Sequence, residues 1–235
     1  MSDMFLSFAL AVIPAILAIT LHEAAHGYAA WALGDDTAKR LGRLSLNPLA
    51  HVDRVGTILL PGFLLISQLL TLGHVGFMFG WAKPVPVAAW NFPNPRRGMM
   101  IVAAAGPAMN FSLAWLAGLA VHLLAFFPVG ADQVAAEFLE NFILINLVLG
   151  LFNLLPIPPL DGGRIVVGLL PEPMALAWAK VERFGILIVL LLVFLLPEAG
   201  KQFGVRFNPV QDGLERIVPW AQHVVFFLSG NDAIS

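Results

Sequence analysis

The sequence predicts an all-α membrane protein, a polytopic helix bundle. Of its 235 residues, 59% are hydrophobic and only 12% are charged, whereas a soluble domain averages about 45–50% apolar and about 25% charged residues. Several apolar runs approach the length of about 20 residues that a helix needs to cross the hydrocarbon core. The length leaves room for several spans and for no sizeable soluble module, so we expect one integral membrane domain over residues 1–235.

Composition also argues against some classes of partner and chemistry. The formal net charge is −2 and the sequence has no long basic tract, so we expect no nucleic-acid partner and expect the lipid bilayer instead. Because there is no cysteine, disulfides, thiolate ligands and thiol nucleophiles are excluded. Residues 5–19 are similar to the core of a signal peptide. However, Asp3 stands where a basic residue is expected and the apolar run continues to Leu33, so we expect a retained helix.

Six apolar segments follow one another along the chain: 5–33, 56–73, 99–127, 138–155, 184–196 and 214–229. The first, third and fourth are credible spans by length. The fifth qualifies if it extends back to Met174, with Lys180 and Arg183 reaching the membrane surface. The sixth contains Pro219 and two charged residues, and it is either a last span or a helix lying in the membrane surface.

The remaining stretches are less regular. Residues 73–98 are rich in glycine and proline and are unsuited to a helix. Residues 41–46 (LGRLSL) and 84–88 (PVPVA) are typical of short extended segments. The last two apolar segments, 174–196 and 214–229, form C-terminal helices that carry no candidate site residue. They could move as a lateral gate or simply pack against the core.

The first segment contains the pattern HEAAH, with His22, Glu23 and His26. Residues four apart on a helix lie about 40° apart on one face, so both imidazoles can reach one metal ion. Glu23 projects about 100° from His22, close enough to hold a metal-bound water. Because unpaired polar groups in hydrocarbon each cost several kcal/mol, this zincin-type pattern favours a metal site over coincidence or hydrogen-bonded structural histidines.

A catalytic zinc takes three protein ligands and keeps one position open for water. Candidates for the third ligand are few: His51, His74, His122, Glu137, Glu140 and Asp161. Asp161 follows an apolar helix that breaks at several prolines, which is tolerated at membrane depth only against protein or a water-filled cavity. An ordinary helix-ending turn, with Asp161 capping the next helix, explains the same residues equally well.

The chain resembles the site-2 proteases, which are zinc-dependent intramembrane metallopeptidases. The resemblance covers roughly residues 10–170. It rests on three motifs in the family's order and spacing: HEAAH (22–26), AGPAMN (105–110) and NLLPIPPLDGG (153–163). It is strongest to small bacterial members, and no PDZ or nucleotide-binding module of the larger members is visible.

The resemblance implies the roles of individual residues. His22, His26 and Asp161 would be the ligands of one Zn²⁺ per chain, and Glu23 the general base. Asn153 would lie in the cleft near the substrate backbone.

If His22, His26 and Asp161 bind one metal ion, segments 5–33 and 138–155 must run parallel. His22 and His26 lie toward the end of segment 5–33, and Asp161 lies just past the end of segment 138–155. An odd number of crossings must separate them, and segment 99–127 supplies one. Residues 34–98 therefore begin and end on the same side. Segment 56–73 is then re-entrant, lies on the surface, or spans and returns through the extended residues 73–87.

Charge asymmetry predicts the orientation. The region between the first two core helices carries seven basic residues: Lys39, Arg40, Arg43, Arg54, Lys83, Arg96 and Arg97. The loop 128–137 has none. By the positive-inside rule the basic side is cytoplasmic. We therefore expect a multi-pass protein of the plasma or inner membrane, with its N-terminus outside and the zinc toward the cytoplasm.

The implied activity is that of a zinc metalloendopeptidase acting within the bilayer, in regulated intramembrane proteolysis. Its substrate would be a single transmembrane helix that unwinds locally, and residues 80–87 (GWAKPVPV) could receive it as an added strand or simply form a rigid surface loop. Asn153 and, second, Asn110 are candidates to stabilise the developing oxyanion. Asn110 equally suits hydrogen bonding between helices at Gly106.

The alternative function is a metal-binding membrane transporter or permeation protein that uses the same His, Asp and Glu residues. No inverted repeat is visible in the sequence, which disfavours it. Glu23 also has a role in hydrolysis that ligation alone does not require.

Overall fold

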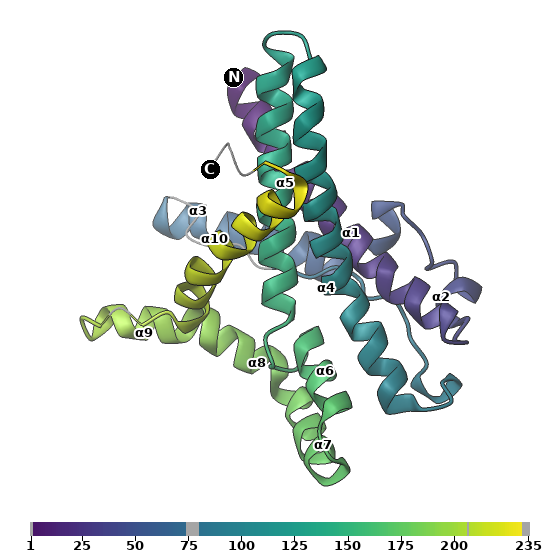
Figure 1. The fold of residues 1–235 in the computed structure, drawn as a ribbon. Coiled ribbons are helices and arrows are strands. Elements are labelled where there is room, and N and C mark those ends of the chain that lie inside the picture. Colours follow the sequence, from purple (N-terminus) through teal and green to yellow (C-terminus); the bar gives the residue numbers. More distant parts are fainter. Residues whose placement is uncertain (1, 74–79, 206, 232–235) are drawn as a thin grey trace.

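The computed structural model describes residues 2–73, 80–205 and 207–231, and within them it contains helices and no strand. Three long helices form the core (Figure 1): α1 (Ser2–Ala32), α4 (Pro95–Ala120) and α5 (Ala131–Asn153). In these described residues, four helical stretches are long and apolar enough to cross a membrane: Phe5–Ala32, Arg54–Thr71, Pro95–Phe126 and Ala131–Asn153. The all-α polytopic fold is confirmed.

The starts of two core helices differ from the sequence prediction. Helix α4 begins at Pro95, because the Asn94 side chain accepts a hydrogen bond from the Arg97 N–H and proline fits the first helical turn. Helix α5 begins at Ala131, directly after Gly130, whose φ of 92° favours glycine. Helix α5 therefore starts before the apolar run expected from about 138, because its first two turns include the polar residues Asp132, Gln133 and Glu137.

The three core helices alternate in direction. His26 of α1 contacts the Val102 carbonyl of α4, and His22, one turn earlier, contacts Asn110, two turns later on α4. Helices α1 and α4 are therefore antiparallel. Because α5 returns from the end of α4 in the same hairpin, it runs parallel to α1, and the start of α1 lies beside the α4–α5 connection (Figure 1). This is the arrangement that a site shared by the ends of α1 and α5 requires.

The connection from α1 to α4 is mostly short helices. It contains α2 (Thr37–Arg40), the 3-10 turn η1 (Pro48–His51), the π-type turn η2 (Arg54–Leu59), α3 (Leu60–Leu72) and the 3-10 turn η3 (Ala89–Asn91). Residues 80–88 have no regular structure and pair into no sheet. His74 and the first part of the expected return, residues 74–79, lie outside the described residues.

Residues 80–88 nevertheless lie alongside α1 and the turn after it. The Val85 N–H donates to Glu23 Oε2 at 3.0 Å, and the Ala88 N–H donates to Asp35 Oδ2 at 2.7 Å. On the other side, the N–H groups of Trp81 and Lys83 donate to the carbonyls of Gly56 and His51. The segment is therefore held on both sides, between α1 and the η1–η2 region.

The region after α5 is divided into short elements. These are α6 (Asp161–Leu169), α7 (Glu172–Ala179), the 3-10 turn η5 (Lys180–Phe184), α8 (Gly185–Leu190), the π-type turn η6 (Leu191–Leu195), α9 (Leu196–Gln202) and α10 (Pro209–Ser229). The expected helix 174–196 is thus interrupted, and it is not among the four candidate spans in the described part of the chain. Helix α10 packs on α4 and α5, and its Ala221 and Val225 join the buried core cluster.

Candidate metal centre

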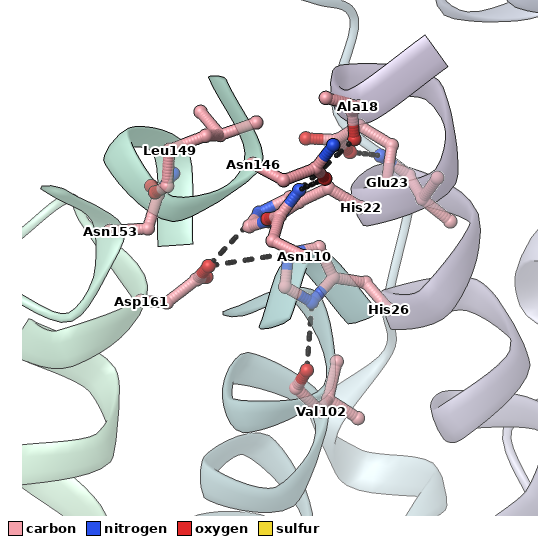
Figure 2. A network of polar contacts seen from close by, with 11 residues as sticks. Ala18, His22, Glu23, His26, Val102, Asn110, Asn146, Leu149, Asn153 and Asp161 are labelled. Carbon is pink, nitrogen blue, oxygen red and sulfur yellow. Dashed lines mark hydrogen bonds and ion pairs between the residues drawn. The ribbon is translucent and has the colours of Figure 1, made fainter. Parts of the chain in front are cut away.

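Three side chains from two distant parts of the chain meet inside the helix bundle (Figure 2). His22 and His26 lie one turn apart on α1, and Asp161 opens α6 directly after the proline-rich turn that ends α5. The His22 and His26 Nε2 atoms are 3.1 Å apart. Asp161 Oδ2 lies 3.1 Å from His22 Nε2 and 3.5 Å from His26 Nε2.

These separations match what zinc requires. Zinc bound tetrahedrally by nitrogen and oxygen at about 2.0–2.1 Å holds its ligand atoms about 3.3 Å from one another. The three sides of the observed triangle lie close to that value. His22 and Asp161 are also buried, at 5% and 7% exposure, so water does not compete freely for the three atoms.

The hydrogen bonds of the imidazoles show that all three atoms present lone pairs. His22 Nδ1 lies 2.6 Å from Asn110 Oδ1, and His26 Nδ1 lies 2.7 Å from the Val102 carbonyl oxygen. Both partners are acceptors, so in the neutral imidazole each Nδ1 carries the proton and each Nε2 carries a lone pair. Asp161 Oδ2 is buried, and no described residue donates a hydrogen bond to it. Three lone pairs this close repel one another unless a cation lies between them.

Gly106 allows α4 to approach this group. A Cβ atom at Gly106 would lie 2.5 Å from Cε1 of both His22 and His26. The sequence identified Gly106 as a point of close helix approach, and in the structure the approaching groups are the two imidazoles.

Glu23 lies beside the triangle and outside it. Its carboxylate comes within 4.8 Å of the histidine nitrogens, and Oε2 accepts the hydrogen bond from Val85. Asn153 donates through Nδ2 to the Leu149 carbonyl at 3.0 Å, and it lines a cavity together with His22 and Glu23.

Asn110 contacts a histidine and not the cavity. Its Nδ2 lies 2.8 Å from Asn146 Oδ1 and 3.4 Å from the Ala18 carbonyl, and its Oδ1 faces His22 (Figure 2). Both ends of its amide are thus engaged between helices. Asn146 was not predicted as a site residue, although a polar residue in the middle of an apolar span is a signal that points to one.

The other histidine and acidic candidates that the structure describes lie elsewhere. His51 Nε2 contacts the Ser45 carbonyl at 2.8 Å, and His122 Nε2 contacts the Ser229 carbonyl at 2.7 Å. Glu137 and Glu140 lie in the first half of α5, well before the end that leads to Asp161.

The cavity beside the triangle has a volume of about 320 Å³ and is mainly apolar. Besides His22, Glu23 and Asn153, its lining includes Ile19, Trp81, Leu149, Phe152, Leu160, Ile186 and Val189. Ile186 and Val189 come from α8, a contribution that the sequence analysis did not foresee. A second cavity of about 430 Å³ shares Ile19, Gly80, Trp81 and Ala82 with the first.

Asp35, just past the end of α1, anchors the far end of residues 80–88. It is fully buried, and its carboxylate accepts hydrogen bonds from the Ala88 N–H and the Asn91 side chain at 2.7 Å, and from Thr37. Burial alone would raise the pKa of Asp35, but the hydrogen bonds from Thr37, Ala88 and Asn91 stabilise the charged form and hold that pKa below its ordinary value.

Comparison with known proteins identifies the family. A model of Peptidase family M50 matches residues 128–196, which include Asn153 and Asp161. The chain is 40% identical over 228 residues to the "Putative zinc metalloprotease YwhC" of Bacillus subtilis (strain 168), an alignment that covers 92% of this chain and 95% of that protein. No solved structure matches the chain.

Two further relatives carry the same kind of name. The chain is 34% identical over 194 residues to the "Putative zinc metalloprotease Rip2" of Mycobacterium tuberculosis (strain H37Rv), covering 82% of this chain and 69% of that protein. The Rip2 protein of Mycolicibacterium smegmatis is 33% identical over 190 residues, with 79% and 67% covered. With its apolar helices and its His-Glu-His group, this chain therefore belongs to Peptidase family M50, the site-2 proteases, and is a multi-pass membrane zinc metalloprotease.

Proposed function

We propose that this metalloprotease cleaves a transmembrane segment of a membrane-protein substrate within the bilayer. In this proposal His22, His26 and Asp161 bind the zinc and Glu23 is the general base. One observation supports it above all: three lone-pair atoms lie 3.1–3.5 Å apart inside the bundle, beside an apolar cavity that Glu23 also lines.

Glu23 moves the proton in this reaction. When bound, zinc lowers the pKa of a water molecule and polarises the substrate carbonyl. Glu23 takes a proton as the water oxygen attacks the carbonyl carbon, and it delivers that proton to the amine nitrogen as the C–N bond breaks. Because the Val85 N–H engages Oε2, we assign the proton to Oε1.

Asn153 is our candidate for the group that stabilises the developing oxyanion. It lines the cavity, and within the described residues its Nδ2 donates only to a carbonyl of its own helix, one turn back. Rotation of this side chain would aim the amide at the substrate carbonyl. Asn110 is the weaker candidate, since both ends of its amide are already bonded between helices.

The substrate helix must unwind before its peptide bond becomes accessible, and residues 80–87 are our candidate for the strand that receives it. Four N–H groups of residues 80–88 are already bonded, those of Trp81 and Lys83 on the η1–η2 side and those of Val85 and Ala88 on the α1 side. The prolines of this segment have no N–H, which leaves Ala82 as the main donor. Ala82 also lines both cavities.

The orientation in the membrane is proposed from charge. The basic residues of the α1–α4 connection would lie in the cytoplasm, in a plasma or inner membrane, with the zinc site toward that side. Reporters fused after Gly34 and after Gly98 should both report the cytoplasm. Reporters on opposite sides would overturn the proposed orientation. They would also overturn the inference that residues 34–98 begin and end on the same side of the membrane.

Glu23→Gln tests the reaction directly. Reconstituted in lipid vesicles, the variant should keep about one zinc per chain and lose about 10²–10⁴-fold in cleavage rate, and a single-span substrate that it traps can then serve as the assay substrate for the wild type. The matched control is Glu137→Gln, on the first turns of α5, which should retain both properties. Loss of zinc in Glu23→Gln would instead favour Glu23 as a ligand, as in a transport site. Retained cleavage would exclude it as the base.

A further inference from the structure

His22 and His26 present Nε2 in different ways. His26 Nδ1 donates to a backbone carbonyl of α4, that of Val102, which cannot change from acceptor to donor. His22 Nδ1 faces the side-chain amide of Asn110, which can rotate by half a turn and offer its NH₂ group instead. His22 therefore needs a further group that holds the Asn110 amide in one orientation.

Asn146 of α5 is placed to do this. Its Nδ2 lies 2.8 Å from the Phe142 carbonyl, which can only accept. Its Oδ1 therefore faces Asn110, and it lies 2.8 Å from Asn110 Nδ2. Both asparagines are fully buried at 0% exposure, so water offers no alternative partner. The Phe142 carbonyl can only accept, so it fixes the orientation of the Asn146 amide. That amide fixes the orientation of Asn110, which in turn faces the His22 imidazole.

We propose that Asn146 is a positioning residue of the metal centre, which holds the Asn110 amide in the one orientation that keeps the proton of His22 on Nδ1 and the lone pair on Nε2. This inference rests on the proposed ligand role of His22. It assigns Asn146 no contact with zinc or substrate.

The opposite orientation would prevent metal binding. With the amide of Asn110 turned, its NH₂ would face His22 Nδ1, and the imidazole proton would move to Nε2. That nitrogen lies 3.1 Å from Asp161 Oδ2, so it would donate a hydrogen bond to the carboxylate. Two of the three proposed ligand atoms would then bind each other and not the ion. Partners one step beyond the ligands are commonly worth 10–100-fold in metal affinity.

The test compares three variants by zinc affinity, measured for the full chain in detergent by competition with a chelator. Asn146→Leu removes the acceptor at similar size and should weaken zinc binding about 10–100-fold. Asn146→Asp, protonated in this buried position, can donate to Phe142 and accept from Asn110, and should bind zinc within about threefold of wild type. Asn141→Leu, the same change on the same helix but in a residue outside the network, should have no effect.

Two results would overturn the proposal. Asn146→Leu could bind zinc as tightly as wild type, or Asn146→Asp could bind it as weakly as Asn146→Leu, which would mean that hydrogen-bond direction has no influence. His22→Ala separates this from the proposed function, because retention of zinc in that variant contradicts the ligand set itself.

A second measurement needs no substitution at Asn146 and applies even if Asn146→Leu does not fold. Nitrogen-15 NMR of labelled histidine in the zinc-depleted full chain reports which ring nitrogen carries the proton. Both His22 and His26 should carry it on Nδ1, with His22→Ala and His26→Ala used to assign the signals. A His22 ring that carries its proton on Nε2 and none on Nδ1 would contradict the proposed direction.

Discussion

Helix α10 and the run from α7 to α9 both follow the metal centre, and the sequence left open for both whether they form a lateral gate or pack against the core, yet they contact the core very differently. Ala221 and Val225 of α10 are buried among Ala114, Ala117, Ile143 and Leu147 of α4 and α5. The end of α10 is fixed by hydrogen bonds from His122 Nε2 to the Ser229 carbonyl and from Asn231 Nδ2 to the Gly118 carbonyl, each at 2.7 Å.

In the described part of the chain, the run from α7 to α9 is held less firmly, with an exposed ion pair between Arg164 of α6 and Glu182. Its buried residues are few among those described, namely Ala175, Gly185 and Val189, whereas Met174, Leu176, Ile186, Leu187 and Leu195 are more than half exposed. A 3-10 turn and a π-type turn interrupt it. The comparison separates two tasks. The anchored core helices carry most of the proposed site residues, and the weakly held run lines one side of the cavity, where we propose that a lateral gate opens.

The largest effect should come from the anchored part, at Gly106. In Gly106→Ala the new Cβ would meet both imidazoles at 2.5 Å, so the histidines or α4 must shift. We expect loss of zinc and of cleavage by at least about 100-fold, because misplacement of catalytic groups by about 1 Å has that cost. The control is Gly62→Ala in α3, where a Cβ meets nothing within 4 Å. Normal zinc content in Gly106→Ala would refute this packing argument.

A smaller effect, of a different kind, should come from α8. Val189 is 9% exposed and lines the cavity, so Val189→Trp should fill the cavity and slow cleavage of a membrane substrate about 10-fold or more while zinc content stays normal. Leu187→Trp, on the exposed face of the same helix, should cleave normally. If Val189→Trp lost zinc as well, α8 would belong to the anchored part and the comparison would fail.

Substitution of Asp35 should lower the stability of the fold more than the rate of catalysis, and the loss of stability should depend on pH. Because its pKa is lowered in the folded protein, its contribution is fully present above the ordinary pKa of an aspartate and is lost as the pH falls through the lowered value. Asp35→Asn should cost about 1–3 kcal/mol at neutral pH, measured by thermal unfolding in detergent, and the difference from wild type should shrink in acid. A difference that does not change with pH would show that the charge has no part in it.

The smallest effect should come from the end of α10. His122→Phe removes one hydrogen bond to the Ser229 carbonyl and should cost about 1 kcal/mol of stability with an unchanged rate of cleavage. Asp36→Ala, which removes an exposed ion pair with Arg40, is a suitable reference and should change stability by less than about 1 kcal/mol. Faster cleavage in His122→Phe would make α10 the gate and reverse the roles of the two regions.

Much of this could be predicted from the sequence, because the bilayer imposes strong constraints. The apolar runs predicted the core helices, and the HEAAH spacing identified His22 and His26 as side chains that share one helix face. These two inferences need only helix geometry and the cost of polar groups in hydrocarbon. The choice of Asp161 came from the resemblance to the site-2 proteases, and the parallel course of α1 and α5 followed from requiring a site shared with it.

Features that depend on tertiary partners could not be predicted. Asn146 is visible as a polar residue, but the sequence does not show that it bonds to Asn110. The apolar residues Ile186 and Val189 give no sign that they line a cavity, and the burial of α10 depends on the shape of the α4–α5 surface. The break-up of segment 174–196 was also missed, since hydropathy alone does not distinguish a continuous helix from a series of short ones.

The position of Asp161 along the chain has a consequence for biosynthesis. The ribosome makes α1 first, so His22 and His26 enter the membrane before Asn110 and Val102 exist to accept their hydrogen bonds, and long before Asp161 is made. A nascent chain that stops at the end of α5 contains every core helix and still lacks the carboxylate that contacts both imidazoles. Under the proposed ligand set, unfinished or prematurely terminated copies are therefore inert, and the cell is spared an active protease until α6 has been synthesised.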